Sequence, residues 1–242
     1  MTTPALEFRQ VSKRYGHADA LKGVSFSVSG GECFGLVGEN GAGKTTLLKC
    51  LLDFCESDSG DIYIQGMPHT APHARAPLSF LPERFVPPYY LTGRDFLRYM
   101  LALQNQAYQD EMALPMLTVL DLDKSALTKP VRAFSKGMTQ KLGLAASLLS
   151  GKAITVLDEP TSGLDPKARA LLKQSLRRMK QAGRTVFLTS HALADVAELC
   201  DRMAVLHQGR LQFAGTPAEL CAQTGKSELE QAFLHCIEAS PL

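Results

Sequence analysis

The residues with the clearest chemistry form a glycine-rich stretch at 38–46, Gly-Glu-Asn-Gly-Ala-Gly-Lys-Thr-Thr. It fits Gly-x-x-x-x-Gly-Lys-[Ser/Thr], a turn whose backbone N–H groups surround a chain of phosphates. We expect Lys44 to reach the β- and γ-phosphates, the Thr45 hydroxyl to bind Mg²⁺, and Thr46 to reach the α-phosphate. The residues of this stretch predicted to bind nucleotide are Gly38, Asn40, Gly41, Ala42, Gly43, Lys44, Thr45 and Thr46.

The flanking residues give this stretch the context that phosphate binding needs. Residues 33–37 are short and apolar and predict a buried strand, and residues 45–52 predict a helix. The positive end of that helix dipole would face the same phosphates. The alternative is a glycine-rich turn without chemical meaning, which the strand and helix argue against.

A second chemical feature is the apolar run at 154–159, Ile-Thr-Val-Leu-Asp-Glu, which ends in two acids. A buried parallel strand would deliver both carboxylates beside the phosphate-binding turn. We expect Asp158 to hold Mg²⁺ and Glu159 to polarise the water that attacks the γ-phosphate. The alternative is a strand that runs into a solvated acidic turn.

Composition limits the classes of partner. The chain of 242 residues is 45% apolar and 21% charged, with a net charge of +2, so no strong attraction to nucleic acid or lipid is expected. No apolar run approaches the roughly 18 residues of a membrane span, and residues 1–7 lack a signal-peptide pattern. We therefore expect a cytosolic chain that touches a membrane through a partner.

The cysteines and histidines do not suggest a metal centre. None of the six cysteines lies in a Cys-x-x-Cys pair, and Cys33 and Cys50 fall inside apolar segments, so we expect reduced thiols. His69 and His73 are four residues apart, but the prolines at 68 and 72 predict a loop rather than one helix face.

Hydrophobic periodicity predicts strands early, helices in the middle and alternating elements late. The predicted strands are 6–11, 21–28, 33–37, 62–64, 78–81, 153–157, 185–189, 202–206 and 210–214, with a turn at 12–16. The predicted helices are 45–52, one that opens at 92–95, 111–120, 139–149, 166–181 and 193–200. This order favours a parallel sheet with helices on both faces.

Together, these motifs resemble those of the ATP-binding subunits of ABC transporters. Residues 134–138, Phe-Ser-Lys-Gly-Met, stand where that family has its Leu-Ser-Gly-Gly-Gln signature. Residues 161–165 follow the two acids as the family's D-loop does. His191 stands at the switch histidine, and Tyr15 at the aromatic position that stacks on adenine.

The resemblance implies an α/β fold: a P-loop NTPase, RecA-like core with an antiparallel β subdomain and a helical ABC subdomain. The whole of 1–242 would be one ABC ATPase domain. Residues 1–83 and 151–220 would form the core with its β subdomain, and 84–150 the helical subdomain. Residues 221–242 would form a short C-terminal helical tail.

The resemblance also implies a function. The chain would bind ATP and Mg²⁺ and pair head to tail with a second copy or a paralogous cassette. It would drive a separate transmembrane permease from the cytoplasmic, inner face of the plasma membrane, without nucleic acid. The implied catalytic residues are Glu159, His191 and Lys44. Asp165 is implied at the nucleotide, and Ser135 and Gly137 would contact the phosphates of the facing subunit, although Ser135 could simply cap its helix.

Two departures from the family pattern bear on this expectation. Phe134, Lys136 and Met138 replace signature residues, although the phosphate-contacting serine and glycine are kept. Glu83 stands where the family has its Q-loop glutamine, and is expected near ATP and Mg²⁺. The stretch at 84–91 is expected to receive a cytoplasmic helix of the permease, or else to be a packed loop.

These features resemble the type 2 exporter branch, which includes drug-resistance, polysaccharide-export and nitrous-oxide-reductase copper-maturation systems. Two alternatives remain. A non-transport ABC ATPase of translation or DNA repair usually carries two cassettes or a long coiled-coil insertion. A regulatory ATP-binding module would lack the catalytic acid or the histidine.

Overall fold

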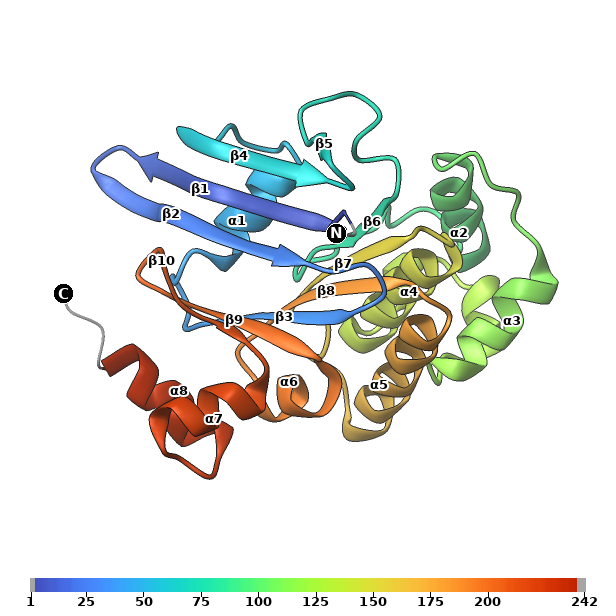
Figure 1. The fold of residues 1–242 in the computed structure, drawn as a ribbon. Coiled ribbons are helices and arrows are strands. Elements are labelled where there is room, and N and C mark those ends of the chain that lie inside the picture. Colours follow the sequence, from blue (N-terminus) through green and yellow to red (C-terminus); the bar gives the residue numbers. More distant parts are fainter. Residues whose placement is uncertain (1–2, 239–242) are drawn as a thin grey trace.

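The computed structural model describes residues 3–238, which form two sheets and a group of helices (Figure 1). The strands are β1 (Leu6–Tyr15), β2 (Ala18–Val28), β3 (Cys33–Val37), β4 (Ser59–Ile64), β5 (Met67–Pro68), β6 (Leu78–Leu81), β7 (Ile154–Asp158), β8 (Thr185–Ser190), β9 (Arg202–His207) and β10 (Arg210–Gly215). The α-helices are α1 (Lys44–Leu51), α2 (Gly93–Ala102), α3 (Asp110–Val119), α4 (Lys136–Leu149), α5 (Pro166–Gln181), α6 (Leu193–Leu199), α7 (Pro217–Thr224) and α8 (Leu229–Glu238). Two 3-10 helices, η1 (Lys124–Leu127) and η2 (Val131–Ala133), lie between α3 and α4.

The larger sheet has the strand order β10-β9-β3-β8-β7-β6 and is parallel except for β10. Strands β3, β7 and β8 are buried along their whole length, as expected for a parallel sheet covered on both faces. Val37 pairs with Ser190, and Asp158 pairs with Thr189. The segments that follow β3, β7 and β8 therefore leave the sheet at one shared edge, where ligands of open α/β sheets bind.

The smaller sheet is antiparallel, with the order β2-β1-β4-β5, and α1 lies between it and the larger sheet (Figure 1). Stacked phenylalanines join the two layers. The Phe8 and Phe26 rings stack with centroids 4.6 Å apart, and Phe26 stacks on Phe34 of β3 at 5.3 Å. Because such pairs contribute beyond their buried area, this stack fixes the antiparallel sheet against β3.

Helices α4, α5 and α6 cover the opposite face of the larger sheet (Figure 1). Helix α4 approaches β6 closely at Gly143, where an added Cβ would lie 2.7 Å from Leu81 Cδ1 and 2.8 Å from the Phe85 ring. The Phe85 ring packs edge-on against Phe96 of α2. Within residues 3–238, no helix is both long and apolar enough to cross a bilayer.

The predicted fold class is confirmed, but three local predictions are wrong or incomplete. Of the turn predicted at 12–16, residues 12–15 are strand, because β1 continues to Tyr15 by pairing with the start of β2, and the turn lies at Gly16 and His17. Helix α4 begins at Lys136, three residues before the predicted start, because the Ser135 side chain caps it. Helix α7 begins at Pro217, before the predicted start of the helical tail at 221, because Thr216 and Glu219 form a capping box there.

Candidate active site

A cavity of about 260 Å³ opens at the shared edge of the parallel strands. Its walls come from the phosphate-binding turn and from the segments after β6, β7 and β8. The lining residues are Ala20, Glu39, Asn40, Gly41, Gly43, Lys44, Thr45, Thr46, Glu83, Asp158, Glu159 and His191. Folding therefore brings ten of the residues predicted for the site into one cavity.

The phosphate-binding turn needs its glycines for two reasons. Gly41 and Gly43 have φ angles of 83° and 110°, which residues with a Cβ rarely adopt. At Gly38 and Gly43, an added Cβ would lie 2.3 Å from the Leu206 carbonyl oxygen and 2.5 Å from the Ala20 carbonyl oxygen, respectively. Backbone conformation and close packing together keep side chains away from the place where phosphates would sit.

Lys44 is buried at the centre of this turn. Its ammonium donates hydrogen bonds to the backbone carbonyls of Gly38, at 2.6 Å, and Glu39, at 3.2 Å. Its Nζ also lies 3.6 Å from Glu159 Oε1. The side chain thus holds positive charge between the turn and Glu159, which suits a group that contacts the terminal phosphates.

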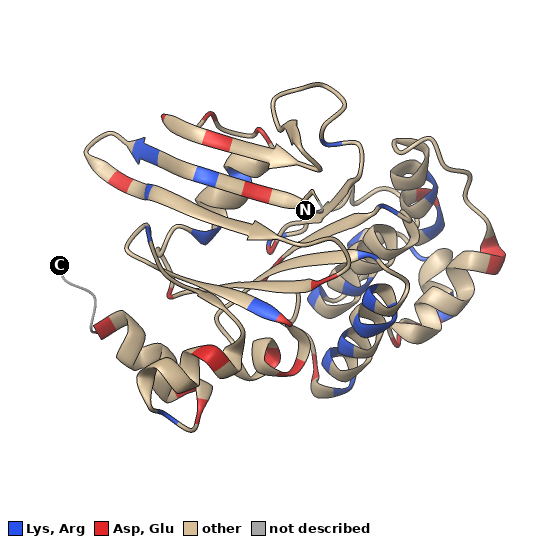
Figure 2. Ribbon diagram, viewed as in Figure 1, with Lys and Arg blue, Asp and Glu red and all other residues tan. Residues whose placement is uncertain are grey.

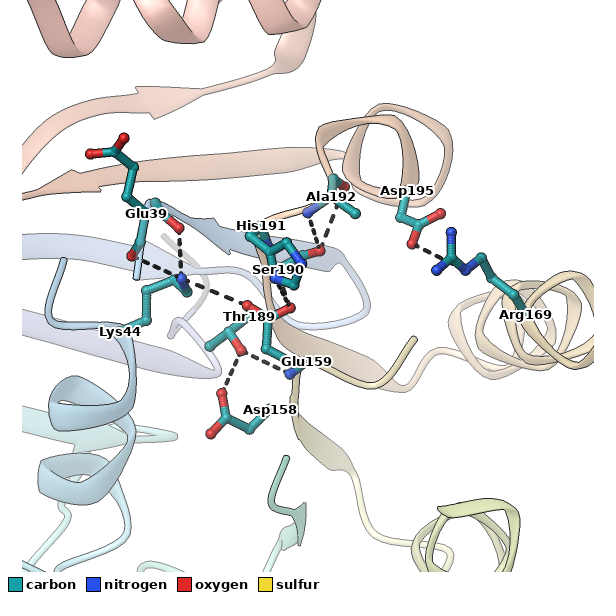
Figure 3. A network of polar contacts seen from close by, with 11 residues as sticks. Glu39, Lys44, Asp158, Glu159, Arg169, Thr189, Ser190, His191, Ala192 and Asp195 are labelled. Carbon is teal, nitrogen blue, oxygen red and sulfur yellow. Dashed lines mark hydrogen bonds and ion pairs between the residues drawn. The ribbon is translucent and has the colours of Figure 1, made fainter. Parts of the chain in front are cut away.

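Asp158 lies at the end of β7 and is held by Thr189 of β8 (Figure 3). The Thr189 hydroxyl donates to Asp158 Oδ1 at 2.6 Å and accepts from the Glu159 N–H at 3.0 Å. Burial raises the pKa of the Asp158 carboxyl, and the charges of Glu159 and Glu83 raise it further. A divalent cation in the cavity would offset that accumulation of negative charge.

Glu159 is held between Lys44 and His191 (Figure 3). Its Oε2 lies 2.8 Å from His191 Nδ1 and accepts from the His191 N–H at 3.3 Å. Its backbone has a φ of 49°, in the left-handed region that costs a residue with a side chain about 1–3 kcal/mol and that is common at active sites. The carboxylate is therefore fixed in direction, as positioning a water molecule requires.

The cavity fits Mg²⁺ bound together with phosphates. Among the described residues, no three His, Cys, Asp or Glu side chains are arranged to hold a metal ion on their own. Mg²⁺ does not need such a cage, because it is usually bound by one or two carboxylates, with phosphates and water as the other ligands. Thr45, Asp158 and Glu83 line the same cavity and supply oxygen atoms of this kind.

Several predicted residues do not line the cavity. Gly38 and Ala42 belong to the turn, but neither contributes to the cavity wall. Tyr15 is 47% exposed, and its hydroxyl donates to Cys55 Sγ at 3.5 Å. The stacking of Tyr15 on adenine therefore stays a prediction.

The signature residues and Asp165 also lie outside the cavity. Ser135 is exposed and caps α4, with its Oγ accepting from the Met138 N–H at 3.2 Å. The Lys136 side chain runs beside Gly163, where an added Cβ would lie 3.4 Å from Lys136 Cε. Asp165 caps α5 by accepting from the Ala168 N–H at 2.9 Å.

Three contributors to the site were not predicted. Thr189 lies near the end of β8 and pairs with Asp158, and its place shortly before His191 in the sequence is a signal that could have identified it. Glu39 lies at a variable position of the glycine-rich pattern, on the cavity wall. Ala20 belongs to the smaller sheet and reaches the cavity only through the packing of the two sheets, which no local sequence pattern reveals.

Comparison with known proteins agrees with this geometry. The sequence profile of the family described as "ABC transporter" matches residues 21–162. The chain is 39% identical over 224 residues to Nod factor export ATP-binding protein I of Burkholderia orbicola, covering 91% of this chain and 73% of that protein. It is also 39% identical over 206 residues to an uncharacterised ABC transporter ATP-binding protein of Synechocystis, covering 84% of this chain and 58% of that protein.

A solved structure described as the ATP-binding subunit of an ABC transporter superposes with a TM-score of 0.88 at 30% identity. The superposition covers 96% of this chain and 99% of that one. Similarity in sequence and in fold thus extends over most of the chain. The chain therefore belongs to the ABC transporter family, as an ATP-binding subunit with ATPase activity.

Proposed function

We propose that the chain closes around ATP as a head-to-tail dimer and thereby drives a separate transmembrane permease. The proposal rests on one observation: the residues predicted to contact ATP lie at two separate places on the chain's surface. The cavity gathers the groups that would bind phosphates and activate water, whereas Ser135 and Gly137 lie outside it at the exposed start of α4. In a head-to-tail pair, each α4 start would cover the cavity of the other subunit.

In the proposed mechanism, ATP phosphates lie in the turn at 38–46, and Lys44 contacts the β- and γ-phosphates. Glu159 orients the attacking water and accepts its proton, while His191 keeps the carboxylate in place. Thr45, Asp158 and Glu83 would hold Mg²⁺, which when bound neutralises phosphate charge. Positioning and charge stabilisation supply most of the rate in this chemistry.

The partner subunit would supply the remaining contacts to the γ-phosphate. Its Ser135 hydroxyl and Gly137 N–H would donate hydrogen bonds, supported by the positive end of the α4 dipole. Asp165 would lie at the same seam. The partner is a second copy or a paralogous cassette, and ATP would hold the two subunits together until hydrolysis separates them.

We also propose that the permease is an exporter and that it docks on residues 84–91, at the inner face of the plasma membrane. Val86, Tyr89 and Tyr90 are 89%, 68% and 70% exposed, which leaves apolar surface for a partner. The Burkholderia relative is named as a Nod factor export protein. These features together with the branch resemblance support export, while the net charge of +2 gives no support for nucleic acid.

Cross-linking between two different variants tests the head-to-tail arrangement. One tagged chain carries N40C, the other carries S135C, and both carry E159Q to prevent turnover. We expect a covalent heterodimer on oxidation in Mg-ATP, and none in ADP or when the E159Q chain without the added cysteines is used. A mixture that gives no more cross-link in ATP than in ADP would contradict the arrangement.

A further inference from the structure

Lys141 of α4 is a buried lysine that the chemistry of the site does not use. Its side chain is 9% exposed. Its ammonium donates to the Asp121 carbonyl oxygen at 3.0 Å and lies 3.5 Å from Asp121 Oδ2 and 3.7 Å from Asp165 Oδ2. One ammonium thus joins three segments: the signature helix, the loop after α3, and the start of α5.

The local structure at Asp121 and at Asp165 orients both residues toward Lys141. Asp121 has a φ of 53°, a conformation uncommon outside glycine, and it is this residue's carbonyl that accepts from Lys141. The two carboxylate oxygens of Asp165 have different partners: Oδ1 caps α5, and Oδ2 faces the Lys141 ammonium. The cap and the charge contact therefore fix one carboxylate from two sides.

Charge makes this contact sensitive to the loss of Lys141. The cap hydrogen bond from Ala168 lowers the pKa of the Asp165 carboxyl most, the Lys141 charge lowers it further, and the Asp121 charge opposes them. Lys167 lies on α5, a helix that carries several basic residues (Figure 2). Its exposed ammonium lies 2.7 Å from Asp121 Oδ1, and its charge also acts on Asp165. Without Lys141, two carboxylates would face each other with no buried cation between them.

The segments joined by Lys141 are those that the proposed dimer uses. Ser135 lies six residues before Lys141 on the same helix, or roughly 9 Å along its axis. Asp165 lies in the D-loop. The start of α4 also approaches Gly163, where the exposed Lys136 side chain passes beside the glycine.

We propose that Lys141 is a positioning residue that locks the D-loop to the signature helix, so that Ser135 and Asp165 meet the partner subunit as one rigid surface. This inference rests on the proposed head-to-tail dimer. Lys141 itself touches neither nucleotide nor metal in this arrangement. Its loss would weaken ATP-driven association and leave nucleotide binding by the single chain unchanged.

The test measures ATP-driven dimerisation by sedimentation of E159Q chains that also carry K141M, K141R or K167M. Methionine keeps the apolar stem of Lys141 and removes its charge. Lys167→Met is the matched control, because Lys167 pairs with Asp121 from the surface and its side chain makes no ion pair with Asp165. We expect K141M to raise the dimer dissociation constant at least about tenfold, and K141R and K167M to leave it within about threefold.

Affinity for ADP, measured on the same chains, separates positioning from general damage. We expect the K141M chain to bind ADP within about twofold of the parent, because the cavity lies elsewhere. Should K141M fold poorly, D165N tests the contact from the other side, since asparagine keeps the helix cap and loses the charge. Its effect on dimerisation should match that of K141M, and the two changes together should be less than additive.

The outcomes separate this inference from the dimer itself. A parent that dimerises while K141M and D165N dimerise equally well contradicts the inference alone. Equal losses of ADP affinity and dimerisation in K141M contradict it too, because they indicate a folding defect. A parent that stays monomeric in Mg-ATP contradicts the proposed dimer and, with it, the inference.

Discussion

At the scale of single residues, the site depends on how Glu159 is held rather than on its presence alone. The sequence identifies two acids after a strand, but it does not reveal the left-handed backbone at Glu159 or the contact with His191. Both depend on the neighbouring strand β8, which lies about thirty residues further along the chain. Local patterns identify the acids, and sheet pairing orients them.

The first prediction concerns the catalytic base. Glu159→Gln keeps the shape of the side chain and removes its ability to accept a proton, so turnover of Mg-ATP should fall by about 10²–10⁴. ATP binding should persist. Phosphate release under saturating ATP measures the change, with Glu198→Gln on α6 as a surface control. Hydrolysis at the wild-type rate by the Glu159→Gln chain would refute the assignment.

The second prediction concerns pH and Asp158. Because burial raises the pKa of Asp158 in the folded chain without metal, folding is favoured more when this carboxyl is protonated than when it is charged. This contribution to stability is lost as the pH rises through the raised pKa. At pH 7 the free energy of unfolding of Asp158→Asn should therefore match or exceed that of the wild type. Below about pH 4, where the wild-type carboxyl is protonated in both states, this difference in the free energy of unfolding should vanish.

Denaturant unfolding of the chain without Mg²⁺, at pH values from about 3 to 7, tests this expectation. Asp61→Asn removes an exposed carboxylate and serves as the control. The same Asp158→Asn chain should lose Mg²⁺-dependent ATP turnover. If Asp158→Asn were destabilised equally at every pH, burial of the charged form would not be the governing effect.

At the scale of elements, the sequence predicts best where end signals are local. Helix α5 was predicted with its observed bounds, because Asp165 caps it, Pro166 begins it and Gly183 follows its end. Residues 12–15 were wrongly predicted as part of a turn, because strand β1 continues to Tyr15 through pairing with β2. The extension of β1 depends on its pairing with β2, which the local sequence pattern at 12–15 does not reveal.

The third prediction concerns the approach of α4 to β6. Gly143→Ala would gain up to about 1 kcal/mol in helix propensity, but its Cβ would overlap Leu81 and the Phe85 ring. We expect a net loss of about 1 kcal/mol in the free energy of unfolding, because overpacking costs about 1–3 kcal/mol. Urea unfolding measures it.

Two further variants show whether overlap is the cause. Gly30→Ala meets nothing within 4 Å and should leave stability nearly unchanged. Phe85→Ala removes the ring that Gly143→Ala would overlap, so the double variant should be more stable than the sum of the single effects predicts. Strict additivity would show that the two positions do not contact each other in solution.

At the scale of the whole molecule, the fold brings distant segments to one edge of a sheet. The residues that line the cavity are spread along the chain from Ala20 to His191. The sequence predicted a parallel sheet covered by helices, but not the strand order that brings these residues together. The packing that places Ala20 on the cavity wall depends on the phenylalanine stack between the layers. The exposed start of α4, by contrast, does not line the cavity. In the proposed dimer, each complete site therefore needs the cavity of one subunit and the start of α4 from the other.

Sedimentation of the Glu159→Gln chain tests this central claim most directly. In Mg-ATP the account predicts a species with twice the 26.3 kDa mass of one chain, and in ADP a single chain. Adding Ser135→Glu, which would place a carboxylate against the facing phosphates, should return the ATP-bound chain to a monomer because like charges repel. A chain that binds Mg-ATP and remains monomeric at every concentration tested would contradict the account.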